Sequence, residues 1–447
     1  MKPNTSLKLP GKVALVLIAG VAGYLCRRAD LGFEPAVVFY VSLIVLMASL
    51  WMLVPNVLLT KVPGLATVGR SLIMLVVLLP AADYAFLKLQ SKVIASTKPF
   101  YSFRAAKGNP AAYAAWWAYY AEEWRRPNGF QASTEMPDPK GILPFVTIPN
   151  STGKFFESVI RFNNFGFRGN DINRNKGDRF RIFALGESPT FGPTIHRDDR
   201  PWPEVLQALV NSRLACVRNI EVINAGTEFY DLNDNLERVR RDIIPLEPDL
   251  VISYHGLNGF RAGFIDNPST AKLSPVIYLL EPQQQRKRPS ALIEAAREKL
   301  YIWKKERTLV STYSEDKIMH RQYAELYREL IRLGHENHFQ VVLANSSLAV
   351  NASSPQDVRE FYGIVSRGIN IWIAQNAAHN EMVKKIANAA GVPFIDTTPN
   401  LDGNWDADLY LDLAHFTQKG NDLIAQHIFD GLVPVLQRDE TLRCVER

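Results

Sequence analysis

The stretch RFRIFALGESPTFG, residues 179–192, decides the fold of this 447-residue chain. An apolar run ends at Gly186, and Ser188 follows with Pro189 directly behind it. Short apolar runs that end in glycine are typical of buried parallel strands. Gly186 predicts a sharp turn off the strand, and proline suits the start of a helix. The stretch therefore predicts a strand, a turn and a short helix whose N-terminus Ser188 caps.

Four more apolar runs follow with helical stretches between them. They are IEVINAG (220–226), DLVISYHG (249–256), FQVVLAN (339–345) and VPFID (392–396). Alternating strands and helices predict an α/β fold, a doubly wound five-stranded parallel sheet with right-handed crossovers. Ligand sites in such sheets lie beyond the carboxyl ends of the strands, where we expect Ser188, Gly226, residues 255–258 and Asn345.

A histidine and a carboxylate stand close together near the C-terminus, in DLYLDLAHFTQKGNDLIAQHI, residues 408–428. Asp412 precedes His415 by three residues, and Thr417 is expected to begin an amphipathic helix. A histidine acts as a base when a carboxylate holds one ring nitrogen and the other faces a hydroxyl. The spacing alone leaves open a catalytic pair, a helix cap or a surface pair.

Taken in order, four blocks resemble the SGNH or GDSL hydrolases over roughly residues 179–435. The blocks are GES with Ser188, NAG with Gly226, GLN with Asn258, and DLAH with Asp412 and His415. The resemblance implies Ser188 as nucleophile, His415 as general base and Asp412 as the residue that orients His415. It also implies an oxyanion hole formed by the backbone N–H groups of Ser188 and Gly226 and the side-chain amide of Asn258.

Two positions depart from the pattern of that family. The family usually has aspartate where this chain has Glu187, and aspartate after the third-block asparagine where this chain has Gly259. Both positions help to place loops, so the departures also allow a catalytically degenerate domain. Three further residues near the blocks are candidate substrate contacts: Glu187, His255 and Asn345.

The first 90 residues carry long uncharged runs at Val13–Cys26, Ala36–Val54 and Ser71–Leu87. Runs of about 17 to 25 apolar residues predict transmembrane helices, here two or three in an N-terminal anchor. The first run is short, and a signal peptide is the alternative, although no small-residue cleavage site follows it. With three spans, the excess of basic residues near the N-terminus predicts that the rest of the chain faces the periplasm. With two spans, it faces the cytoplasm.

Residues 91–178 are expected to form a linker. AAYAAWWAYYAEEWRR, residues 111–126, predicts an aromatic helix for core packing, for a membrane interface or, as an alternative, for stacking on sugars. Residues 144–169 predict a small β element. Within it, NNFGFRG, residues 163–169, resembles membrane-attached bacterial members of the family, which are often found with cell-envelope polysaccharide or lipid systems.

The hydrolase-like domain is predicted at residues 179–437, with a helical insertion at about 264–335. Residues 290–310 of this insertion predict a basic amphipathic helix. It suits an anionic lipid surface, an acidic polymer or simple packing on its own domain.

Several function classes find no support in the sequence. The net charge of +6 comes without a basic-aromatic binding motif, so no nucleic-acid partner is expected. No phosphate-binding glycine motif and no complete metal motif occur, so neither a cofactor nor a metal is expected. Cys216 and Cys444 are left for a disulfide, and the sequence leaves their pairing open.

Together these patterns predict a membrane-anchored serine esterase or O-acyl (acetyl) transferase with no cofactor. Its expected substrates are carbohydrate or lipid esters of the cell envelope. Its expected location is the bacterial inner membrane, as a multi-pass protein with the catalytic domain in the periplasm. The lipid bilayer and other membrane subunits are the expected partners. The rival hypothesis is an inactive SGNH domain that serves as a binding or structural subunit of a membrane complex.

Overall fold

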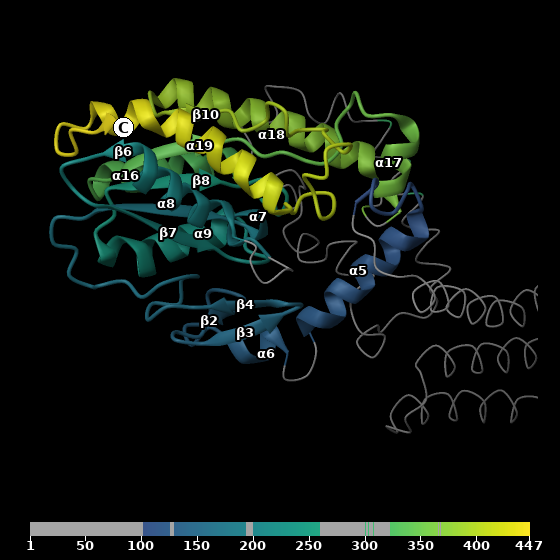
Figure 1. Ribbon diagram of the computed structural model, residues 1–447, viewed down its shortest axis with the longest axis horizontal. Helices are drawn as coiled ribbons and strands as arrows, with labels where there is room; N and C mark the ends of the chain where they lie inside the picture. The colour runs from purple at the N-terminus through teal and green to yellow at the C-terminus, as the bar shows by residue number, and fades with distance from the viewer. Residues whose placement is uncertain are drawn as a thin grey trace, which may run out of the picture. The chain divides into compact units, whose positions relative to one another are not determined.

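The computed structural model in Figure 1 describes residues 102–125, 129–193, 200–259, 322–364 and 368–447, with residues 300, 303, 307 and 366 besides. Most of them belong to one compact unit, Thr97–Leu280 and Lys304–Arg447. The expected membrane anchor (1–90), with its three apolar runs, and most of the insertion at 264–335, including the basic stretch from 290, lie outside the described residues. No helix within the described residues is long and apolar enough to span a bilayer.

A five-stranded parallel sheet forms the centre of this unit. Its strands are β5 (Phe180–Gly186), β7 (Ile220–Gly226), β8 (Leu250–Tyr254), β9 (Gln340–Ala344) and β10 (Phe394–Ile395). They lie in the order β10-β9-β8-β5-β7, and every pair is parallel. Each of β5 and β8 is buried along its whole length, as their continuous apolar runs predict. The predicted α/β fold and all five strands are confirmed.

Two groups of helices pack on the sheet. Helix α8 (Trp202–Arg213) packs on α19 (Gln418–Arg438) and on β7, whereas α16 (Gln322–Glu336) packs on α9 (Leu232–Arg238) and α18 (Ile369–Ala390). The shorter α17 (Gln356–Gly363) packs on α18. A π-helical turn η1 (Val239–Ile243) and a 3₁₀ turn η2 (Ile244–Leu246) continue α9. As predicted, Thr417 caps α19, because its hydroxyl accepts the Gly420 N–H at 3.2 Å.

The segment ahead of the sheet consists of one long helix and small β elements. Helix α5 (Pro110–Arg125) is followed by α6 (Phe130–Thr134). Strand β1 (Glu135–Met136) pairs with β2 (Val146–Thr147), and β3 (Thr152–Phe155) pairs with β4 (Ser158–Arg161). The aromatic residues of α5 mostly serve as core, since four of them are buried: Tyr113, Trp116, Tyr120 and Trp124.

The C-terminus is joined to the amino end of β7. Strand β6 (Leu214–Ala215) pairs with β11 (Val445–Glu446), and next to this pair Cys216 forms a disulfide with Cys444. The pairing that the sequence left open is therefore formed.

Candidate active site

Ser188 is the first residue of the short helix α7 (Ser188–Phe191), directly beyond the carboxyl end of β5. Glu187 occupies the N-cap position, so the prediction that Ser188 caps this helix is wrong. Gly186 is required for space, since a Cβ there would lie 2.1 Å from Thr190 Oγ1 and 2.3 Å from the Tyr254 carbonyl oxygen. With no backbone group to cap, the Ser188 hydroxyl is left for a partner from another part of the fold.

That partner is His415. Its Nε2 lies 2.8 Å from Ser188 Oγ, and its Nδ1 lies 2.6 Å from Asp412 Oδ2. The other Asp412 oxygen, Oδ1, accepts the backbone N–H groups of Ala414 and His415, both at 2.9 Å. Because the ionised carboxylate only accepts, Nδ1 carries the proton and Nε2 is left to accept from the serine. The three side chains, from positions 188, 412 and 415, form one continuous buried relay.

The surroundings of His415 favour its protonated form. Burial alone lowers the pKa of His415, but the Asp412 charge and hydrogen bond raise it, and the Glu228 charge raises it further. The net pKa is raised above the ordinary value of 6.5. The imidazole is therefore a stronger base than a free histidine, which suits removal of a proton from a hydroxyl.

The three predicted oxyanion donors differ in whether they already donate to another group of the protein. The backbone N–H of Gly226 donates to Asn224 Oδ1 at 3.0 Å, so this predicted donor already has a partner, and its role in an oxyanion hole stays a prediction. Gly226 instead allows close packing, since a Cβ there would lie 2.2 Å from the Phe191 nitrogen. Asn258 Nδ2 donates one proton to the Tyr230 carbonyl at 2.9 Å and keeps a second. The Ser188 N–H and the second Asn258 proton remain the candidate donors.

Glu187 holds the third block in place. Its buried carboxylate accepts the backbone N–H groups of Gly256 at 3.2 Å, Asn258 at 2.8 Å and Gly259 at 3.2 Å. Burial raises the pKa of Glu187 to about 7, against the lowering effect of these hydrogen bonds. A Cβ at Gly259 would lie 1.8 Å from the Tyr323 hydroxyl, so no larger residue fits there. Both departures from the family pattern thus have structural reasons.

His255 and Asn345 are also tied into the fold rather than available to a ligand. Asn235 Nδ2 donates to His255 Nε2 at 3.0 Å, and Ser253 Oγ lies 2.8 Å from His255 Nδ1. Burial lowers the pKa of His255 to about 3, so the ring is neutral. Asn345 bridges the ends of β9 and β10, because it donates to Asp396 at 2.8 Å and accepts the Thr397 N–H at 2.7 Å. The expectation that His255, Asn345 or Glu187 contacts substrate is therefore not supported by the geometry.

Three residues around His415 belong to no sequence motif: Trp117, Tyr120 and Glu228. The Tyr120 ring lies nearly parallel to the imidazole, with centroids 5.9 Å apart, and the Trp117 ring lies 6.3 Å from it. Tyr120 donates a long hydrogen bond of 3.5 Å to the buried Glu228. Burial raises the pKa of Glu228 to about 7, although the His415 charge opposes this. In the sequence, Glu228 is marked only by its position two residues beyond Gly226, between Thr227 and Phe229.

Within the described residues, no group of three or more His, Cys, Asp or Glu side chains is arranged to hold a metal. The chemistry available at this site is that of an activated serine.

Comparison with known proteins gives the family. The model of the GDSL-like lipase/acylhydrolase family matches residues 184–423, more than half of the chain. The chain belongs to this family. As a GDSL-type protein it is a serine hydrolase of the esterase class, and its four sequence blocks all fall within or at the edge of the matched region.

The solved structures that match part of the chain include an esterase and a lipase. An acetylxylan esterase from Geobacillus stearothermophilus shares 15% identity over 57% of this chain and 94% of its own, with a TM-score of 0.34. A GDSL-like lipase from Bacteroides thetaiotaomicron shares 16% identity over 57% of this chain and 89% of its own, with a TM-score of 0.33. No curated protein matches the sequence. The family assignment rests on the family model alone.

Proposed function

We propose that Ser188, His415 and Asp412 are the catalytic triad of an esterase or O-acyl transferase that acts on acylated carbohydrate of the cell envelope. The observation that carries this proposal is the relay of two short contacts, 2.8 Å from Ser188 to His415 and 2.6 Å from His415 to Asp412. A nucleophile, a base and an orienting carboxylate in this order are the requirements of acyl transfer through serine.

In the first half of the reaction, Ser188 Oγ attacks the ester carbonyl carbon while its proton passes to His415 Nε2. The backbone N–H of Ser188 and the second side-chain amide proton of Asn258 donate to the oxyanion of the tetrahedral intermediate. His415 then returns the proton to the oxygen of the departing alcohol, and an acyl-serine remains. Asp412 stays ionised and stabilises the imidazolium throughout.

In the second half, His415 takes a proton from the molecule that attacks the acyl-serine. Water releases the free acid, which is esterase activity. A sugar hydroxyl yields a new ester, which is transferase activity. The relay serves both reactions, since only the attacking oxygen differs.

The enclosure of the site favours a short acyl group. Ser188 is 6% exposed and His415 is 5% exposed, and the rings of Trp117 and Tyr120 lie next to the base. An acetyl ester needs less space than a long fatty chain, so acetylated carbohydrate is the first proposed substrate and a lipid ester the second.

The proposed location is the outer side of the bacterial inner membrane, with the expected N-terminal anchor in the bilayer. The Cys216–Cys444 disulfide supports this proposal, because disulfides persist in oxidising compartments such as the periplasm.

Labelling with a fluorophosphonate probe tests the proposed nucleophile in the full chain, solubilised in mild detergent. We expect stoichiometric labelling that Ser188→Ala abolishes. Ser212→Ala, which removes an exposed serine of α8, is the matched control and should label normally. A folded protein that fails to label would contradict the proposed triad, and would favour the inactive binding subunit considered above.

A further inference from the structure

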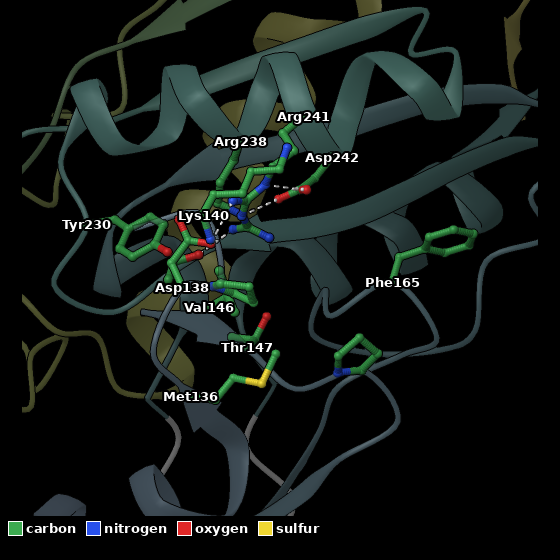
Figure 2. Close-up of a pocket in the computed structure, with 13 residues that line it drawn as sticks. Met136, Asp138, Lys140, Val146, Thr147, Phe165, Tyr230, Arg238, Arg241 and Asp242 are labelled. Carbon is green, nitrogen blue, oxygen red and sulfur yellow. Dashed lines mark hydrogen bonds and ion pairs between the residues drawn. The ribbon is translucent and has the colours of Figure 1, made fainter. Parts of the chain in front are cut away.

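A cavity of about 280 Å³, shown in Figure 2, is lined in part by Thr227 and Tyr230 from the loop that follows β7. One wall comes from the segment ahead of the sheet, with Met136, Lys140 and Phe165. The opposite wall comes from the loop and helix after β7, with Tyr230, Arg238 and Arg241. This volume is at the lower end of ligand pockets, which span roughly 300 to 1,000 Å³, and therefore suits one or two small rings.

Three cations and two carboxylates line the cavity, and the two arginines among the cations pair with the carboxylates. Asp138 accepts three backbone N–H groups and Arg241 Nη1, the latter at 3.1 Å. Asp242 accepts Arg241 Nε at 3.0 Å and lies 3.6 Å from Arg238 Nε. With Lys140, the lining holds three positive and two negative side chains. Each arginine is thus paired with a carboxylate, and the remaining positive charge is that of Lys140, whose ammonium suits an anionic group.

Lys140 is the cation most available to a ligand. It is exposed, and among the described residues its ammonium forms no ion pair. Figure 2 shows Lys140 beside Arg238 and Arg241 at the Tyr230 side of the cavity, with Phe165 at the other side. A ligand that fits both sides carries a negative charge at one end and an apolar face at the other. A sugar ring with a carboxylate has this shape, because its C–H face packs on aromatic rings.

A single short loop separates this cavity from the triad. Thr227 and Tyr230 line the cavity, whereas Glu228, between them, acts electrostatically on His415. The Tyr230 carbonyl also accepts the Asn258 amide at 2.9 Å. Two residues span at most roughly 7 Å of chain, so a ligand in the cavity lies close to the loop that borders the reacting groups.

We propose that this cavity is a binding subsite for an acidic sugar residue, one that carries a carboxylate and belongs to the same polysaccharide as the acylated residue. This inference rests on the proposed function. It narrows the proposed substrate from acylated carbohydrate to acylated carbohydrate that also carries carboxylates. Lys140 binds the carboxylate, and Phe165 packs on the ring. Arg241 contributes the N–H groups that Asp138 and Asp242 leave unused, whereas Arg238 is buried and donates to the Ala225 carbonyl at 2.9 Å.

Binding can be measured without catalysis. Isothermal titration of the full chain in detergent compares unesterified trigalacturonate with neutral xylotriose. We expect the acidic trisaccharide to bind at least about tenfold more tightly, and raised salt to weaken only its binding. Lys140→Gln should weaken binding of trigalacturonate roughly 5- to 10-fold and leave xylotriose unchanged. Lys154→Gln, an exposed lysine on β3, is the matched control and should change neither.

Equal binding of both trisaccharides, or no effect of Lys140→Gln, would overturn the subsite. Inorganic phosphate that competes as well as galacturonate at equal concentration would overturn the sugar part of the proposal. Hydrolysis of 4-nitrophenyl acetate separates the two proposals, because it needs the triad and not the subsite. Preferential binding of trigalacturonate without hydrolysis of the ester would support the subsite and contradict the esterase. Hydrolysis without a preference for trigalacturonate would support the esterase and contradict the subsite.

Discussion

The carboxyl edge of the parallel sheet and the segment ahead of the sheet contribute different things to this site. The sheet and the turns that follow it supply Ser188, Asp412 and His415, with every relay contact between 2.6 and 2.8 Å. The segment at 110–168 supplies Tyr120 beside the base and Lys140 beside the neighbouring cavity. The edge of the sheet thus carries the proposed reacting groups, whereas the segment ahead of the sheet covers the proposed base and lines the proposed subsite.

The largest loss of kcat is expected for Asp412→Asn, which changes a residue at the carboxyl edge of the sheet. The two backbone N–H groups that Asp412 Oδ1 accepts would hold the amide oxygen, so its NH₂ would face His415 Nδ1 and force the proton to Nε2. With the wrong nitrogen protonated, we expect kcat for 4-nitrophenyl acetate to fall by roughly 10³ to 10⁴. Asp422→Asn, an exposed carboxylate on α19, should leave kcat unchanged. A loss below about tenfold would show that Asp412 does not orient the base.

The difference between the two regions also explains what the sequence could predict. The strands repeat a simple apolar pattern, so the pattern predicts the sheet. The local spacing of Asp412 and His415 left several roles open, and their assignment with Ser188 to one triad came from the resemblance to the SGNH hydrolases. The close packing of Gly226 against Phe191 could not be predicted, because it depends on a contact between positions 35 residues apart in sequence. Tyr120 was indistinguishable from its buried neighbours on α5, since only the folded chain shows that its ring lies over His415.

A smaller loss of kcat is expected for changes at Tyr120, which lies on α5 in the segment ahead of the sheet. Tyr120→Leu removes a ring that lies nearly parallel to the imidazole, and aromatic pairs contribute about 0.5 to 1.5 kcal/mol. We expect kcat to fall up to about tenfold with KM for a small soluble ester unchanged, because the ring positions the base rather than binding the ester. Tyr120→Phe keeps the ring and should lose less than about threefold. Tyr119→Leu, 39% exposed on the same helix, is the matched control. Equal losses at 119 and 120 would indicate general damage to α5.

A change in pH dependence rather than in maximal rate is expected at Glu228, where the two regions meet. The base must be neutral to act, so the rate rises as pH passes upward through the raised pKa of His415. Glu228→Gln removes one cause of that rise, and the acid limb of kcat/KM should move to lower pH. The limb should not move in Glu360→Gln, which changes an exposed glutamate on α17. A shift to higher pH would contradict the assigned electrostatic role.

The smallest effect on catalysis is expected at the disulfide, although its effect on stability is large. Cys216 precedes β7 and therefore lies at the amino end of the strand, opposite the edge that carries Ser188. The bond closes a loop between positions 228 residues apart, and disulfides of this kind stabilise by about 2 to 5 kcal/mol. Cys216→Ser combined with Cys444→Ser should lower the denaturation midpoint accordingly while the rate per folded molecule stays within about twofold. Urea unfolding followed by circular dichroism, with esterase assays before the transition, measures both. A loss of rate in the folded variant would mean that the disulfide at the amino end of the sheet affects the geometry of the site. The carboxyl edge of the sheet would then not determine the activity by itself.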